Sequence, residues 1–171
     1  TNKSNVHKIS SNLIKLQKEE YLKGYDKKST FLNYAKKVDI TKINLISLLS
    51  ELKKQHKLIV GYGASGRANT LIQYCDINKE FLDYIVDDAP TKQGYFTPGS
   101  HLKIFSKDKL DDEMPDFILI FAWSFFEEII EKNIKYLKKG VKFIVPLPKV
   151  KLIYMKNGSI VEETYEKQTG V

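Results

Sequence analysis

Residues 57–70 read Lys-Leu-Ile-Val-Gly-Tyr-Gly-Ala-Ser-Gly-Arg-Ala-Asn-Thr, and this stretch decides the fold. The short apolar run 58–60 predicts a strand, and Gly61, Gly63 and Gly66 follow it before a helical pattern begins. Glycines at this spacing allow a tight turn, let a phosphate approach the backbone and let the helix pack closely on the strand. Free N–H groups at the helix start can then bind an anion. The stretch predicts a nucleotide site at the carboxyl edge of a parallel sheet.

An acidic pair follows the next apolar run of the chain. Residues 81–86 predict a second strand that ends in Asp87 and Asp88, and Asp87 lies 21 residues after Gly66. A carboxylate at this spacing is placed to accept hydrogen bonds from ribose hydroxyls. It would also repel the 2′-phosphate of NADP. Ile59 and Val60 stand where sites for S-adenosylmethionine usually carry an acid, so we do not expect the methyl donor to bind here.

The segment after the second strand is a further candidate for ligand binding. Residues 88–101 predict a long loop, placed where open α/β sheets bind their ligands. The candidate binding residues of this loop are Lys92, Gln93, Tyr95, Thr97 and His101. Trp123 ends a later apolar run and has two interpretations, as a core side chain or as a ring platform at the mouth of the site.

The rest of the chain alternates between strands and helices. Strands are expected at 58–62, 81–86, 102–105, 117–122 and 141–145, and a helix over 67–74. Ser124-Phe125-Phe126-Glu127 has the form of a capping box, which predicts a helix from Ser124 to about Leu137. Asn157-Gly158 predicts a hairpin between residues 151–155 and 159–163, and residues from Thr164 onward are expected to fray.

The N-terminal part carries helical stripes before the first strand. Apolar residues recur at helical spacing over 4–23 and again from Phe31 to about Lys54, either as one long helix or as two with a kink near Asp39. We therefore predict an α/β fold: a Rossmann-like, mostly parallel sheet with helices on both faces, an N-terminal helical extension and a C-terminal β-hairpin. The expected divisions are 1–56 for the extension, 57–164 for the Rossmann-like domain and 165–171 for a tail.

Composition and charge argue against membrane-spanning, nucleic-acid-binding and secreted proteins. The chain has 171 residues, of which 42% are hydrophobic and 29% charged, and a formal net charge of +7. No apolar run approaches the roughly 18 residues of a membrane span, and no nucleic-acid-binding motif is present. The N-terminus is polar and lacks a secretory signal, so we expect a cytoplasmic protein.

No residue pattern indicates catalysis or metal binding. Ser65 and Cys75 are possible nucleophiles, but no base is apparent beside either of them. The three histidines lack the spacing of metal ligands, and one cysteine rules out an internal disulfide. The sequence thus predicts a binding domain without a catalytic group of its own.

Four segments together resemble a known family. They are residues 61–71, 86–102 (which contain Lys-Gln-Gly and Thr-Pro-Gly), 121–125 (Phe-Ala-Trp-Ser-Phe) and 143–148 (Phe-Ile-Val-Pro-Leu-Pro). In this order they resemble the C-terminal domain of the S-adenosylmethionine-dependent sugar C-methyltransferases, which serve deoxysugar biosynthesis. Full chains of that family have an N-terminal zinc module, a middle domain for the methyl donor and a C-terminal Rossmann-like domain that helps to hold a nucleotide-linked keto-sugar.

The resemblance implies that this chain is the third part, with binding roles only. Gly61, Gly63, Ser65 and Arg67 would face phosphate or sugar, and Asn69 and Thr70 would cap and shape the turn. The loop residues from Lys92 to His101 would line the cleft toward the methyl-donor domain. S-adenosylmethionine would be the cofactor of the parent enzyme and would bind outside this domain.

Two other classes of function stay open. The first is the NAD-binding domain of an oxidoreductase, for which too few residues remain to build a substrate domain. The second is a non-enzymatic interaction module. The apolar stripes over residues 4–54 must be covered, so we expect them to pack partly on the sheet domain and partly on a missing domain or a second copy in a homodimer.

Overall fold

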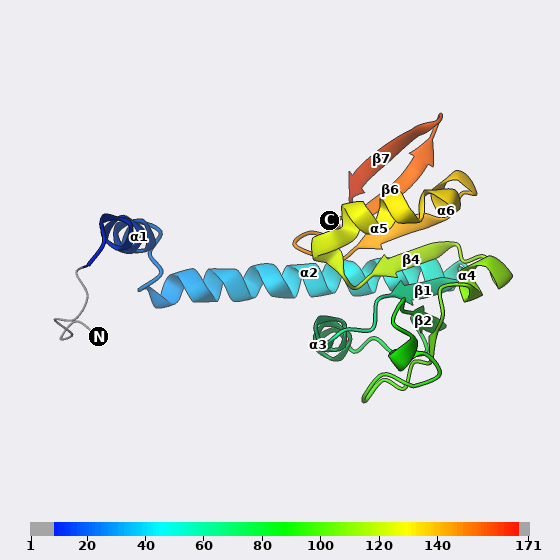
Figure 1. The fold of residues 1–171 in the computed structure, drawn as a ribbon. Helices are drawn as coiled ribbons and strands as arrows, with labels where there is room; N and C mark the ends of the chain where they lie inside the picture. Colours follow the sequence, from blue (N-terminus) through cyan, green and yellow to red (C-terminus); the bar gives the residue numbers. More distant parts are fainter. Residues whose placement is uncertain (1–8, 168–171) are drawn as a thin grey trace. The chain divides into compact units, whose positions relative to one another are not determined.

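A computed structural model describes residues 9–167 of the chain, and its elements follow the order expected for an α/β protein (Figure 1). The described residues form two compact units, one that ends at Asp39 and one that begins at Ile40. The boundary falls inside one helix, α2 (Lys28–Lys54).

The second unit is built on a seven-stranded sheet in the order β3-β2-β1-β4-β5-β6-β7. The first five strands in this order are parallel, and β6 and β7 are antiparallel. The strands are β1 (Ile59–Tyr62), β2 (Tyr84–Val86), β3 (Ile104–Phe105), β4 (Phe117–Ile120), β5 (Lys142–Val145), β6 (Lys151–Lys156) and β7 (Ser159–Thr164). The prediction of a Rossmann-like, mostly parallel sheet with a C-terminal hairpin is confirmed.

Helices cover both faces of this sheet. On one face, the C-terminal half of α2 contributes Leu45 and Leu49 to a core that also contains α3 (Gly66–Cys75). On the other face, the core includes side chains from α4 (Lys109–Asp112), α5 (Phe126–Lys132) and α6 (Ile134–Lys138). Residues alternate between the two cores along β1, with Ile59 on the α2 face and Val60 on the other, as a strand covered on both faces requires.

The first unit contains α1 (Ser11–Leu22) and the start of α2. The Ser10 hydroxyl accepts a hydrogen bond from the Leu13 N–H at 3.2 Å, which fixes the start of α1. The expected helix began at residue 4, and that beginning lies outside the described residues. No residue of α1 is buried, and α2 continues through Asp39 as one helix rather than as two.

The prediction of one helix from Ser124 to about Leu137 is wrong in its start and in its continuity. Residues Trp123–Phe125 form a short 3-10 helix, and α5 starts only at Phe126. Ser124 therefore does not cap a helix, and its hydroxyl oxygen accepts a hydrogen bond from Arg67 instead. Asn133 separates α5 from α6, where its buried amide donates to the Ile129 carbonyl at 2.7 Å.

Residues 165–167 are held more firmly than expected, whereas the rest of the expected tail, residues 168–171, lies outside the described residues. The Tyr165 N–H donates to the Val150 carbonyl at 2.9 Å, and the Tyr165 hydroxyl donates to Glu51 of α2 at 2.7 Å. The Lys167 N–H donates to the Asn44 side chain at 3.1 Å. Residues 165–167 are therefore tied to α2 and to the start of β6 rather than frayed.

Candidate functional site

The carboxyl ends of β1 and β4 meet where the order of the strands reverses. From β1 the chain crosses through α3 to β2 on one side, and from β3 it returns to β4 on the other side of β1. In open α/β sheets, ligands bind in the crevice at such a reversal, beyond the carboxyl ends of the strands. The glycine turn after β1 and the segment from Ala122 to Phe125 after β4 therefore lie where a ligand site is expected.

The three glycines of the turn have different roles. Gly61 is buried within β1, and a Cβ there would lie 2.6 Å from the Phe121 ring and 2.9 Å from Ile85. It allows close packing within the sheet, and its expected contact with a phosphate or sugar stays a prediction. Gly63 makes the turn itself, with a φ of +94° and its N–H bonded to the Val86 carbonyl at 2.8 Å. Gly66 opens α3, with no heavy atom within 4 Å of its Cβ position, which leaves room for a ligand to approach.

The start of α3 is shaped by Ser65 rather than by Asn69 and Thr70. The Ser65 hydroxyl accepts a hydrogen bond from the Ala68 N–H at 3.2 Å, so Ser65 is the N-cap. The first intrahelical bond is donated by the Asn69 N–H, which leaves the N–H groups of Gly66 and Arg67 without a helical acceptor. The Thr70 hydroxyl donates to the Gly66 carbonyl at 3.1 Å.

Arg67 and Trp123 come together across the reversal point. The Arg67 guanidinium lies 5.7 Å from the centre of the Trp123 ring and 5.9 Å from that of Phe125. It also donates to the Ser124 hydroxyl at 3.0 Å. Trp123 packs partly against both cores of the sheet, which agrees with its interpretation as a core side chain, and its role as a platform at the mouth of a site stays a prediction. An exposed cation is thereby held at the crevice next to the start of α3.

Asp87 is buried, and both oxygens of its carboxylate accept hydrogen bonds from within the protein. One oxygen accepts hydrogen bonds from the Ala64 N–H at 2.6 Å and from the Lys92 ammonium at 2.9 Å, and the other accepts from the Ala89 N–H at 2.9 Å. Burial alone would raise the pKa of Asp87, but the bonds from Ala89, Lys92 and Ala64 outweigh it and lower the pKa. Asp87 therefore ties the glycine turn to the segment after β2.

Lys92 and Gln93 are part of the same internal network. Lys92 forms the ion pair with Asp87, and its side chain is 40% exposed. The Gln93 amide donates to the Asp87 backbone carbonyl at 2.9 Å. Both residues stay at the carboxyl edge of the sheet, as expected, but their polar atoms are engaged with Asp87 in this structure.

The loop beyond Gln93 runs away from the carboxyl edge. Gly94 and Thr97 donate backbone hydrogen bonds to Ile104 and Leu102, so the segment returns alongside β3 as an antiparallel ribbon. At its tip, the Pro98 carbonyl accepts from Gln73 in the last turn of α3 at 2.9 Å. Since α3 runs from the carboxyl edge to the amino edge, the tip lies at the amino edge.

This course of the loop separates the expected loop residues from the glycine turn. The Thr97 hydroxyl is buried and accepts from the Leu102 N–H at 2.9 Å, while His101 has a φ of +51° in the tight turn. Tyr95 lies on the outer strand of the ribbon and is 67% exposed. Contrary to the expectation, the structure does not bring Thr97 and His101 to the carboxyl-edge cleft.

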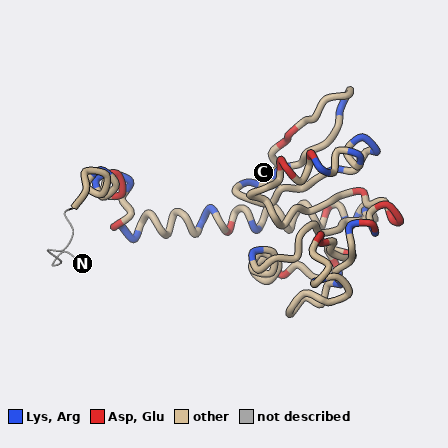
Figure 2. Tube along the Cα trace, viewed as in Figure 1, with Lys and Arg blue, Asp and Glu red and all other residues tan. Residues whose placement is uncertain are grey.

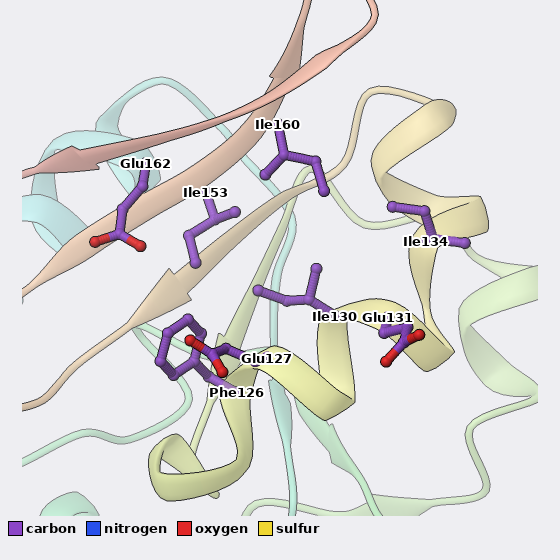
Figure 3. Close-up of a pocket in the computed structure, with 8 residues that line it drawn as sticks. All are labelled: Phe126, Glu127, Ile130, Glu131, Ile134, Ile153, Ile160 and Glu162. Carbon is purple, nitrogen blue, oxygen red and sulfur yellow. The ribbon is translucent and has the colours of Figure 1, made fainter.

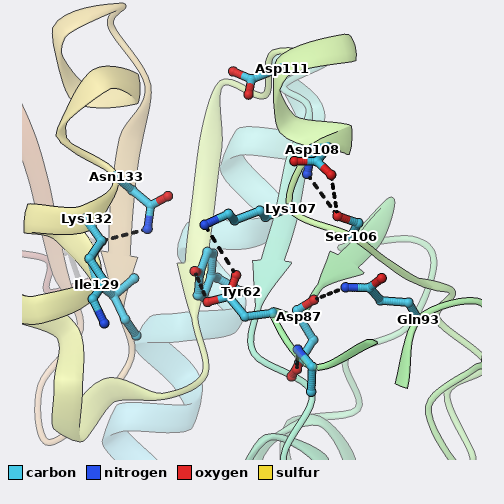
Figure 4. Close-up of polar contacts among 12 residues, drawn as sticks. Tyr62, Asp87, Gln93, Ser106, Lys107, Asp108, Asp111, Ile129, Lys132 and Asn133 are labelled. Atoms are coloured by element: carbon cyan, nitrogen blue, oxygen red, sulfur yellow. Dashed lines mark hydrogen bonds and ion pairs between the residues drawn. The ribbon is translucent and has the colours of Figure 1, made fainter. Parts of the chain in front are cut away.

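A second polar cluster at the carboxyl edge was not identified from the sequence (Figure 4). The Tyr62 hydroxyl, at the end of β1, donates to Asp88 at 2.8 Å, and Lys107 lies 3.8 Å from the other oxygen of Asp88. Burial and the bond to Asp88 raise the pKa of Tyr62 to about 12, so the phenol stays protonated at neutral pH. Tyr62 reads as an ordinary strand residue, and only the register of β1 against β2 places it beside Asp88.

The described residues hold no constellation for metal or nucleophilic chemistry. Among residues 9–167, no group of three or more His, Cys, Asp or Glu side chains is arranged to hold a metal ion. Burial raises the pKa of the Cys75 thiol to about 11, which keeps it in the unreactive form at neutral pH. None of the helices in this range is both long and apolar enough to cross a bilayer.

Comparisons with known proteins identify a family that matches most of the chain. A family model described as the C-methyltransferase C-terminal domain matches residues 1–148. C-methyltransferase NovU from Streptomyces niveus is 26% identical over 147 residues, which cover 86% of this chain and 35% of NovU. The crystal structure of UDP-D-quinovosamine 4-dehydrogenase from Vibrio fischeri is similar with a TM-score of 0.38 and 17% identity, over 63% of this chain and 93% of that chain.

Proposed function

Because the chain belongs to the family of C-methyltransferase C-terminal domains, we propose that it binds a nucleotide-linked keto-sugar as the substrate of a longer C-methyltransferase. The chain spans 35% of the length of NovU, so the methyl donor, S-adenosylmethionine, would bind in another domain of such an enzyme. That methyl-donor domain is then the partner that completes the substrate cleft. In this proposal the chain supplies binding groups and no catalytic group.

The arrangement around Arg67 is the observation that carries this proposal. The N–H groups of Gly66 and Arg67 at the start of α3 lack helical acceptors, and the guanidinium of Arg67 lies beside Trp123, which follows β4 at the strand reversal. Helix starts and arginine side chains both favour phosphate oxygens, and arginine can bind two of them at once. Gly66 leaves open space beside the backbone there. A diphosphate is the part of a nucleotide sugar that matches these donors.

The contacts of the carboxylate at the end of β2 support a nucleotide sugar rather than a dinucleotide or S-adenosylmethionine as the ligand. In dinucleotide-binding sheets this carboxylate accepts hydrogen bonds from the ribose hydroxyls. Here both oxygens of Asp87 already accept from Ala64, Ala89 and Lys92. The Ala64 N–H is also used by Asp87 and is not offered to a phosphate. These contacts support a diphosphate site without the ribose contact that NAD requires.

Ligand-induced stabilisation of the 171-residue chain tests the proposal. Thermal unfolding is measured with a thymidine diphosphate hexose, a uridine diphosphate hexose, NAD and S-adenosylmethionine in separate samples. A ligand at about 100 times its Kd stabilises the folded state by about 2.7 kcal/mol. We expect a diphosphate sugar to raise the Tm and the other two ligands to leave it unchanged. A shift with NAD and none with either nucleotide sugar contradicts the proposal.

Substitution of Arg67 identifies the site. If Arg67 makes a charge-assisted bond to phosphate, Arg67→Ala loses about 1.5–3 kcal/mol, which is roughly a ten- to hundredfold increase in Kd. Lys79→Ala is the matched control, because Lys79 is an exposed cation in the connection from α3 to β2, at the amino edge of the sheet. Equal affinities of the two variants would place the phosphate elsewhere.

A further inference from the structure

An apolar groove lies between α5 and the β6–β7 hairpin, away from the glycine turn (Figure 3). Its volume is about 480 Å³. Ile130 and Ile153 form part of its floor and are almost fully buried, whereas Ile160 of β7 is 53% exposed. Glu127, Glu131 and Glu162 surround this apolar surface. The groove combines exposed apolar side chains with a negative rim, a combination typical of a surface that binds another polypeptide.

The charge of the rim indicates the chemistry of what it binds. The chain as a whole carries a formal net charge of +7, and its cations and carboxylates are interspersed along the chain (Figure 2). The three glutamates around the groove therefore form an acidic rim on a chain with a positive net charge. Lys151 pairs with Glu162 at 2.6 Å, whereas none of the ion pairs formed among residues 9–167 includes Glu127 or Glu131. An apolar element with positive flanks matches this surface.

Every copy of the chain carries such an element in its first unit. Residues 9–39 contain seven lysines and four acidic residues. Their large apolar side chains are exposed, and those above one-half exposure include Ile14 at 58%, Leu16 at 51% and Phe31 at 61%. No side chain of α1 is buried, so this unit lacks a core of its own.

We propose that the groove of one copy binds the N-terminal helical unit, residues 9–39, of a second copy. Two copies related by a two-fold axis then exchange the same contact, groove to helix and helix to groove, and the assembly closes as a dimer. The apolar stripe of the helical unit covers Ile160, and its lysines lie against Glu127 and Glu131. This inference does not depend on the proposed ligand, because the groove and the glycine turn involve different residues.

The oligomeric state of the 171-residue chain, measured by sedimentation equilibrium, tests this directly. We expect a reversible dimer that weakens as the salt concentration rises, because salt screens exposed charge pairs. Ile160→Lys is expected to increase the dimer dissociation constant by about tenfold or more, as for an interface hot spot. Met114→Lys is the control, since Met114 is 39% exposed and lies outside the groove. Dichroism confirms that each variant is folded.

A charge exchange makes the test specific for the two surfaces. One variant carries Glu127→Lys and Glu131→Lys, and the other carries Lys28→Glu and Lys36→Glu. In each variant alone the groove and the helical unit have the same sign, so we expect monomers. In an equal mixture both exchanged contacts are complementary, so we expect a heterodimer. A monomeric wild type, a dimer that Ile160→Lys leaves intact, or variants that fail to pair when mixed would each overturn the proposal.

Discussion

Replacement of Asp87 with asparagine removes one charge from the side chain at the end of β2 that holds the glycine turn in place. The side chain keeps its shape and one carbonyl oxygen, but the second acceptor becomes an NH2 group. That group then faces either the Ala64 and Lys92 donors or the Ala89 N–H, which are the three partners of the wild-type carboxylate. At least one buried backbone N–H therefore loses its acceptor.

The expected cost follows from these contacts. A hydrogen bond to a charged group contributes about 1.5–3 kcal/mol, and a donor left without an acceptor adds a desolvation penalty of about 1–3 kcal/mol. The Lys92 side chain is 40% exposed, so its ammonium regains solvation when its partner is lost. This solvation limits the total loss of stability that the substitution causes. We expect Asp87→Asn to lower the free energy of unfolding by about 2–4 kcal/mol at pH 7.

The lowered pKa of Asp87 predicts how its contribution to the free energy of unfolding changes with pH. The pKa of Asp87 is lowered in the folded state, so its stabilising contribution is present above the unfolded value, about 3.9, and is lost as the pH falls through the folded value. Urea unfolding of wild type and Asp87→Asn is measured from pH 7 to pH 3. The difference between the two proteins is expected to be constant near neutrality and to shrink below about pH 4.

A control variant separates this network from a general effect of charge. Asp111→Asn removes the same charge from a carboxylate that pairs with Lys135 at the surface, and we expect it to leave the urea midpoint nearly unchanged. Faster hydrogen exchange at the Ala64 amide in Asp87→Asn would locate the loss at the glycine turn. Equal urea midpoints for wild type and Asp87→Asn at pH 7 would refute the reasoning.

Two further predictions concern the turn and the helix starts. Gly61→Ala places a Cβ 2.6 Å from the Phe121 ring and should destabilise by about 1–3 kcal/mol in urea unfolding, whereas Gly66→Ala, with open space around it, should not destabilise. Ser65→Ala removes the N-cap of α3 and should cost about 1 kcal/mol, whereas Ser124→Ala, at a position that caps no helix, should change stability by less than about 0.5 kcal/mol. Equal costs within either pair would contradict the assigned roles.

The sequence alone determined the elements whose signals are local. The strand, glycine turn and helix over residues 57–75 follow from apolar residues and from glycine conformations that depend only on neighbouring residues. The hairpin follows in the same way, because Asn157 and Gly158 both adopt the positive φ that a two-residue turn requires. The leucines of the C-terminal half of α2 pack on the sheet, as their helical spacing predicted.

Local sequence signals did not predict the structure where a side chain or backbone segment could form hydrogen bonds with more than one partner. Ser124 has the sequence of a capping residue, but Arg67 from another element takes its hydroxyl and a 3-10 helix precedes α5. The polar loop after β2 looked like a binding loop, yet its backbone pairs with the segment around β3 and carries Thr97 and His101 away from the glycine turn. The Ser124 hydroxyl binds a residue that is distant in the sequence, and the loop is directed by its backbone pairing with residues 102–104. The composition of either segment does not indicate these contacts.

Part of the candidate site could be predicted from the sequence, and part of it depends on the tertiary structure. The sequence determined that a glycine turn would precede a helix start at the carboxyl edge of a sheet, because spacing alone sets that geometry. Only the tertiary structure decided that Asp87 turns inward to Ala64 and Lys92, and that Trp123 arrives from β4 to support Arg67. Strand order and register bring the distant partners together, since Ala64 and Asp87, like Arg67 and Trp123, lie more than 20 residues apart in the chain.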